Sequence, residues 1–125
     1  MNFKDSVTTC VAKFATFKGR ASRSEFWWFY LFYVLVSLTL PIVESWIVGL
    51  GNDSLVTIFL FLEVAIFLGL VITFISVSCR RLHDYSKSGW WQLLYLTVIG
   101  ALLLFYWFTR KGDDDANRYG DYIST

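Results

Sequence analysis

The sequence has few of the side chains used in metal sites and nucleophilic active sites. It contains one histidine and two cysteines, and charged residues make up only 17% of its 125 positions. Two cysteines do not indicate a disulfide framework, and the spacing of Cys10 and Cys79 matches no metal-binding motif. A formal net charge of +1 gives no general attraction to nucleic acid. We therefore expect free thiols, no metal, no cofactor and no nucleic-acid partner.

Charge is almost missing from three long stretches, and this is the most informative absence. Residues 26–48, 55–79 and 90–108 carry at most one formal charge each. A helix needs about 20 apolar residues to cross a bilayer core of about 30 Å. The chain is also 56% hydrophobic and 20% aromatic, with a mean hydropathy of +0.52. The sequence predicts an all-α integral membrane bundle of three transmembrane helices, forming one domain.

The flanking segments refine this expectation. Trp and Tyr gather at both ends of the first and third apolar stretches, as they do at membrane interfaces. No cleavable signal peptide is expected, because the first apolar run starts only at Phe26 and exceeds a typical signal core. In the leader, residues 1–25, apolar residues recur at helical spacing between polar ones. This predicts an amphipathic helix lying in the inner interface; the alternative is a short cytosolic helix packed on the loops.

The distribution of Lys and Arg predicts how the chain is oriented. Five lie in the leader, none in residues 49–54, three in residues 80–89 and three in the polar tail, residues 109–125. With three spans, a cytoplasmic N-terminus places eight inside and three outside, as the positive-inside rule favours. A third segment that turned back near Gly100 would bring the tail inside as well. Nineteen residues suffice for one crossing and are short for a hairpin, so we expect three spans and an external C-terminus.

Three motifs carry a family resemblance. They are Gly19-Arg20-Ala21-Ser22-Arg23-Ser24-Glu25-Phe26-Trp27, then Arg80-Arg81-Leu82-His83-Asp84 followed by Ser88-Gly89-Trp90-Trp91, and finally Asn117-Arg118-Tyr119-Gly120. In order and spacing the chain resembles the DUF805 family of small bacterial inner-membrane proteins. It lacks the proline that the family often has in the third span and the proline that usually follows the last motif. The resemblance implies residence in the bacterial inner membrane, with several spans, and implies no activity.

The basic motifs supply the candidate binding residues. On one face of the membrane, we expect a cluster that binds anionic lipid headgroups or another anion, made of Arg20, Arg23, Arg80, Arg81 and His83. Arg20 and Arg23 would pair either with Asp84 or with phosphate, and Ser22 or Ser24 would cap the first span. The structural alternative is that the arginines anchor a helix end and satisfy its carbonyls, since cations suit a helix C-terminus.

Acidic residues provide the second set of candidates. Glu44 and Glu63 lie inside apolar spans, where a carboxylate is costly unless it is paired, hydrated or protonated. Glu63 is either a proton or cation site or a neutral acid hydrogen-bonded to a neighbouring helix. Residues 113–117 begin like a calcium-binding loop, but Arg118 stands where that loop needs glycine. We therefore expect a solvated acidic tail there.

No set of residues resembles a catalytic constellation, since the sequence has no evident nucleophile and no second histidine. Small residues recur along the second span at Ala65, Gly69, Thr73 and Ser76, which favours close helix packing and a homo-oligomer. The sequence therefore favours a non-enzymatic, oligomeric membrane scaffold, modulator or minimal solute or ion pathway. The alternative is a lipid-handling or lipid-modifying membrane enzyme that uses the motif at residues 80–84.

Overall fold

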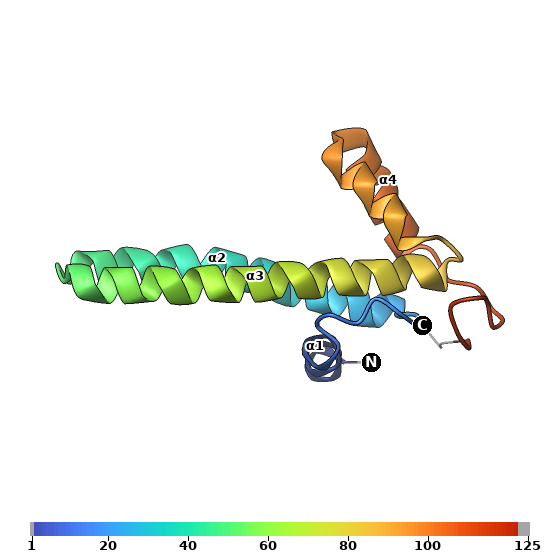
Figure 1. The fold of residues 1–125 in the computed structure, drawn as a ribbon, viewed down its shortest axis with the longest axis horizontal. Coiled ribbons are helices and arrows are strands. Elements are labelled where there is room, and N and C mark those ends of the chain that lie inside the picture. Colours follow the sequence, from blue (N-terminus) through green and yellow to red (C-terminus); the bar gives the residue numbers. More distant parts are fainter. Residues whose placement is uncertain (1, 123–125) are drawn as a thin grey trace.

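The computed structural model describes residues 2–122, and this part of the chain is helical (Figure 1). The helices are α1 (Phe3–Ala12), α2 (Arg23–Gly49), α3 (Asp53–Asp84) and α4 (Val98–Thr109), with a 3₁₀ helix, η1 (Gly89–Leu96), directly before α4. Within residues 2–122 the only β-type pairing is an isolated bridge between Asn117 and Gly120. The all-α fold class is confirmed.

Helices α2 and α3 run side by side as a long hairpin (Figure 1). Both are long and apolar enough to cross a membrane. Ser22 caps α2 by accepting a hydrogen bond from the Glu25 amide at 3.1 Å, which confirms the expected cap. Asn52 caps α3 in the same way, accepting from the amides of Ser54 and Leu55. These caps satisfy amides that have no partner inside their own helix.

The third apolar segment differs from the single crossing that its length suggested. It is divided at Thr97, where an extended backbone (φ −121°, ψ 148°) separates η1 from α4. Its two ends lie together, because the rings of Trp91 and Trp107 are 5.5 Å apart. The segment is therefore a helical hairpin that leaves and returns to the same end of the molecule. Nineteen residues are enough for this because each arm is short.

The end of α3 also differs from expectation. We expected a loop from Arg80 to Gly89, but α3 continues through Asp84 and is capped by Tyr85. The final three turns of the helix, from Thr73 to Asp84, are mostly buried, whereas its first half is mostly exposed. The charged motif is thus the last part of a helix, and its side chains point into surrounding protein.

The packed core lies at one end of the α2–α3 hairpin. Helix α1 lies against α2 there, and α4 leaves the same end at a wide angle (Figure 1). The fully buried apolar side chains of this core include Phe26, Phe29, Leu82, Leu104 and Phe108. The leader and the tail meet at this end as well. Leader and tail thus lie at the same end of the α2–α3 hairpin, whereas three crossings with an external C-terminus would place them at opposite ends.

Candidate functional site: a buried arginine cluster

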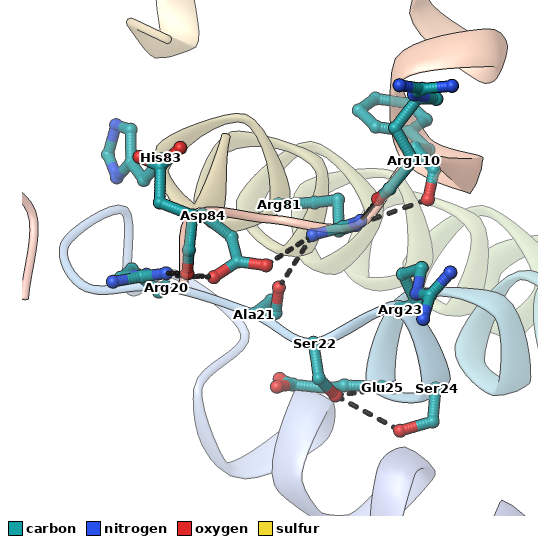
Figure 2. Close-up of polar contacts among 12 residues, drawn as sticks. Arg20, Ala21, Ser22, Arg23, Ser24, Glu25, Arg81, His83, Asp84 and Arg110 are labelled. Atoms are coloured by element: carbon teal, nitrogen blue, oxygen red, sulfur yellow. Dashed lines mark hydrogen bonds and ion pairs between the residues drawn. The ribbon is translucent and has the colours of Figure 1, made fainter. Parts of the chain in front are cut away.

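Asp84 is the centre of the polar cluster at the packed end. Its carboxylate is completely buried and accepts hydrogen bonds from two arginines. One oxygen lies 2.8 Å from Nε and 2.7 Å from Nη2 of Arg20, and the other lies 2.5 Å from Nη1 of Arg81 (Figure 2). The expected pairing of Arg20 with Asp84 is confirmed. Buried charges are tolerated when they are paired and hydrogen-bonded in this way.

The remaining donors of Arg20 bind the tail. Nη2 donates to the carbonyl of Asp113 at 2.8 Å, and Nη1 donates to the carbonyls of Asp115 at 2.9 Å and Gly120 at 3.4 Å. The Asp113 amide donates in return to the carbonyl of Asp84 at 2.8 Å. Arg20 is only 4% exposed as a result. Its guanidinium holds the tail against the leader and the end of α3.

Arg81 connects the same carboxylate to the end of α4. Its Nε donates to the carbonyl of Phe108 at 3.2 Å, and its Nη2 donates to the carbonyl of Arg110. Nη1 contacts the carbonyl of Ala21 in addition to Asp84 (Figure 2). The last carbonyls of a helix have no intrahelical donor, so these contacts act as a C-terminal cap supplied by another helix. Arg81 thereby fixes where the η1–α4 hairpin returns.

Arg80 occupies a second, separate ion pair. Its Nη1 lies 2.5 Å from Oε1 of Glu25, and the two side chains are 1% and 5% exposed. Cys10 of α1 lies on the same carboxylate, with Sγ 3.7 Å from Oε1. Burial raises the pKa of the Cys10 thiol to about 12, and the negative charge of Glu25 adds to this effect. The pair therefore joins α1, α2 and α3 and leaves Cys10 as a neutral thiol.

The ring of His83 is held on several sides. Nδ1 lies 2.9 Å from the carbonyl of Gly19, and Nε2 lies 3.5 Å from Sγ of Cys79. The ring stacks on Tyr119, with centroids 3.9 Å apart and planes 1° from parallel. Because a carbonyl only accepts, Nδ1 carries the proton in this contact. His83 is thus a docking residue for the tail as well as a neighbour of the leader.

Arg23 is the one member of the predicted anion-binding set that lies at the rim. It is half-buried, and Nη1 lies 3.5 Å from the carbonyl of Thr109. It lines an open groove of about 500 Å³ between the start of α2 and the end of α4. The rest of the lining is two hydroxyl residues, two tryptophans and one leucine: Ser24, Thr109, Trp27, Trp28 and Leu31. The structure thus separates Arg23 from the buried cluster of Arg20, Arg80 and Arg81.

The two acidic residues predicted inside the spans are both half-buried. Glu63 lines a groove of about 300 Å³ between α2 and α3, across from Ser37 and Pro41. Proline lacks the amide hydrogen that would bond four residues back, so Pro41 leaves the carbonyl of Ser37 without its usual helical donor. Glu63 therefore faces a neighbouring helix of its own chain, near the Ser37 carbonyl that lacks its helical hydrogen-bond donor.

The chemistry available to the buried cluster is mainly structural. Arg20, Arg81 and Asp84 use their polar atoms on each other and on backbone carbonyls, and a catalytic group needs access to its substrate. Among residues 2–122 no group of three or more His, Cys, Asp or Glu side chains is arranged to hold a metal ion. Removing one member of a buried ion pair costs about 3–5 kcal/mol. The cluster is a clamp that connects leader, tail, α3 and α4.

Some of the clamp was not anticipated from the sequence. Glu25 was recognised only as part of a motif, and its pairing with Arg80 was missed although opposite charges near two helix ends were a usable signal. The backbone carbonyls that bind Arg20 and Arg81 leave no signal in the sequence. Gly112 was also missed: a Cβ there would overlap the Asp84 carboxylate, so the tail passes too close for any side chain.

Comparisons with known proteins relate this chain to inner membrane proteins. The chain is 35% identical over 106 residues to the inner membrane protein YhaI of Escherichia coli strain K12, covering 84% of this chain and 83% of YhaI. It is 33% identical over 108 residues to the inner membrane protein YhaH of the same strain, covering 83% of this chain and 84% of YhaH. No solved structure matches it. Residues 14–121 match the family described as protein of unknown function DUF805, so this helical membrane protein belongs to the DUF805 family.

Proposed function

We propose that this protein is a non-enzymatic scaffold of the bacterial inner membrane that acts as a homo-oligomer. The observation that carries the proposal is the internal use of the motif at residues 80–84. Arg80, Arg81 and Asp84 are at most 1% exposed, and His83 is 8% exposed. Residues that would serve a lipid-modifying enzyme are instead spent on holding the chain together, which favours a structural role over catalysis.

The placement of basic residues supports a cytoplasmic location for both termini. All 11 Lys and Arg lie between residues 4 and 23 or between 80 and 118, and the turn between α2 and α3 has none. With the third segment folded back, these two regions lie at the same end of the α2–α3 hairpin. The positive-inside rule therefore favours a chain with two crossings, its turn outside and all basic residues in the cytoplasm.

Self-association is supported by the outer half of the hairpin. Two helices cannot cover each other on all sides, and α2 and α3 expose large apolar side chains there, such as Leu38, Phe61 and Val64. Lipid would solvate these well, but a carboxyl group in hydrocarbon is costly. A second copy laid over the groove that contains Glu63 would shield this group. We place the contact between copies at this groove.

Crosslinking tests the contact directly. Val64 lines the groove and is 57% exposed, whereas Ile58 is 58% exposed and lies on the opposite face of α3. In a background with serine at both native cysteine positions, Val64→Cys should form a disulfide-linked dimer in native membranes under mild oxidation. Ile58→Cys is the matched control and should stay monomeric. A monomeric Val64→Cys variant, together with a monomer mass in lipid nanodiscs, would overturn the oligomeric scaffold.

The lipid-handling alternative is favoured by one observation, the groove at Arg23. Aromatic walls, a hydroxyl and a guanidinium at a membrane interface suit an anionic lipid headgroup. Arg23→Gln should then weaken retention of phosphatidylglycerol, measured by native mass spectrometry, by about fivefold, since one basic residue contributes about 1 kcal/mol near an anionic surface. The control is Lys111→Gln, because Lys111 is an exposed tail cation outside this groove. Equal retention in both variants would remove the lipid-handling alternative.

A further inference from the structure

The η1–α4 hairpin has the composition of a membrane segment but lacks the length to cross. No charged residue occurs between Gly89 and Thr109. An eight-residue 3₁₀ helix spans about 16 Å at about 2.0 Å per residue, and the twelve residues of α4 span about 18 Å at 1.5 Å per residue. The hydrocarbon core is about 30 Å thick. Each arm therefore reaches about halfway through a bilayer.

The far end of this hairpin is apolar and almost uncovered. Leu96 is 84% exposed, Ile99 is 83% exposed and Val98 is 80% exposed. These residues flank the break at Thr97 between η1 and α4. Figure 1 shows α4 pointing away from the α2–α3 pair. Apolar surface of this kind costs about 25 cal/mol for each Å² left in water. Acyl chains would remove this cost without any further protein contact.

Backbone at such a break must also be satisfied, because hydrocarbon offers no hydrogen bonds. The hydroxyl oxygen of Thr97 accepts from the amide of Gly100 at 3.0 Å, and the Thr97 amide donates to the carbonyl of Leu94 at 3.1 Å. The Thr97 carbonyl accepts from the amide of Ala101 at 2.9 Å. Gly100 permits this close turn, since a Cβ there would overlap Leu94 and Thr97. The tip carries its own hydrogen bonds and is suited to a lipid environment.

The base of the hairpin has the opposite character. Lys87 places Nζ 4.4 Å from the ring centroid of Trp107 and 5.6 Å from that of Trp91. On the other arm, the guanidinium of Arg110 lies 5.8 Å from the ring centroid of Tyr106. Basic residues beside Trp and Tyr are typical of the headgroup layer. The hairpin thus changes from an interfacial base to an uncharged, largely apolar tip over about half a bilayer.

We infer that the η1–α4 hairpin is a re-entrant element that inserts into the leaflet on the side of the termini, with Leu96 and Ile99 among the acyl chains. Its partner is the hydrocarbon of that single leaflet. The clamp at Arg81 holds the returning end of α4 by the carbonyls of Phe108 and Arg110, so the hairpin cannot slide through to the other side. This placement is independent of whether copies of the chain associate.

Spin-label depth measurements test the inference in full-length protein. Single cysteines at Leu96, Leu38, Lys4 and Asp114 would be labelled in a background with serine at both native cysteine positions. The protein would be reconstituted into vesicles of phosphatidylethanolamine and phosphatidylglycerol. Leu38 lies in the middle of α2 and serves as the deep control, and Asp114 in the exposed tail serves as the aqueous control. Ile99→Cys is a second tip reporter in case the label at position 96 perturbs the hairpin.

The expected result is that a tip label collides several-fold more often with oxygen than with an aqueous nickel complex, as the label at position 38 does. The label at position 114 should show the reverse, and labels at Lys4 and Asp114 should be reduced by ascorbate from the same side of the vesicle. A tip label with the aqueous pattern would overturn insertion. Protection from both collision partners would indicate a protein–protein contact and overturn lipid as the partner. Labels 4 and 114 on opposite sides would show a complete crossing and overturn the re-entrant hairpin.

Discussion

Arg20 and Asp84 lie 64 positions apart in the chain and form a buried ion pair, with Nε and Nη2 at 2.8 and 2.7 Å from one carboxylate oxygen. The other oxygen of Asp84 binds Arg81, which holds the end of α4. Four segments meet at this carboxylate: the leader, the end of α3, the end of α4 and the tail. Their joining holds the leader and the tail at the same end of the α2–α3 hairpin and fixes the returning end of α4 there.

Replacing Asp84 should destabilise the protein strongly. Asp84→Asn keeps the size of the side chain but leaves Arg20 and Arg81 buried without their counter-ion, which costs about 3–5 kcal/mol. The free energy of unfolding in detergent, followed by tryptophan fluorescence, measures the loss. Asp114→Asn is the control, since Asp114 pairs with Lys111 at an exposed site and such pairs contribute at most about 1 kcal/mol. Equal stability of the two variants would contradict the clamp.

The neighbouring arginines should respond differently to lysine. Arg81 uses Nε, Nη1 and Nη2 on separate partners, so Arg81→Lys leaves buried carbonyls unpaired. Arg80 uses only Nη1, and its Nε and Nη2 have no hydrogen-bond partner among the described residues. Arg80→Lys can keep the contact with Glu25 and removes the two nitrogens, Nε and Nη2, that have no partner. We expect Arg81→Lys to lower the free energy of unfolding by about 1–3 kcal/mol more than Arg80→Lys does. A larger loss of unfolding free energy in Arg80→Lys would contradict the conclusion that Arg81 makes more of the stabilising hydrogen bonds.

Gly112 should be the glycine most sensitive to alanine in the tail. The added Cβ would overlap the carboxylate of Asp84, so Gly112→Ala should detach the tail. Protease cleavage of the tail in detergent should then become faster. Gly69→Ala is the matched control, because a Cβ at Gly69 meets nothing within 4 Å inside α3. That variant should keep the wild-type cleavage rate, and a protected tail in Gly112→Ala would show that the tail does not depend on this close approach.

Sequence patterns predicted the parts of this fold that follow from composition. Hydropathy identified α2 and α3, and the serines before Glu25 indicated the α2 cap. The shared position of Arg20 and Asp84 relative to the spans was enough to suggest their pairing. The spans and the cap depend on residue type and spacing within a short segment. The pairing of Arg20 with Asp84 depends on which ends of the spans lie together. A single sequence holds both kinds of information.

The parts that were missed depend on the path of the chain and on hydrogen bonds to backbone carbonyls. An apolar stretch such as residues 90–108 has the same hydropathy whether it crosses once or turns at Thr97, and the turn is decided by local hydrogen bonds and by the lack of a Cβ at Gly100. The motif at residues 80–84 resembled a charged loop because its partners were unknown. Carbonyls of Phe108 and Asp113 bind arginines through atoms that every residue has.

Docking of the tail should weaken in acid. The hydroxyl of Ser86 and the amide of Asn117 donate to the Asp113 carboxylate and hold its pKa below its ordinary value of 3.8. Because the docked tail favours the charged form, this stabilisation is complete above pH 3.8 and is lost as pH falls through the lower pKa of the docked state. The amide resonance of Tyr119 in detergent should report the change. In Asp113→Asn this acid-dependent shift should disappear, whereas its persistence would assign the transition to another group.

Cys10 should resist thiol reagents although it lies on a short helix near the N-terminus. Its pKa is raised to about 12 by burial and by the Glu25 carboxylate, and only the thiolate reacts rapidly. In a Cys79→Ser background, maleimide labelling of Cys10 should stay slow from pH 7 to about pH 10. The control adds Val11→Cys together with Cys10→Ser, which moves the thiol one residue to a position that is 54% exposed. Equal labelling rates at the two positions would mean that α1 is not packed against α2 in the membrane. The ion pair of Arg80 and Glu25 would then be exposed on the side that α1 buries.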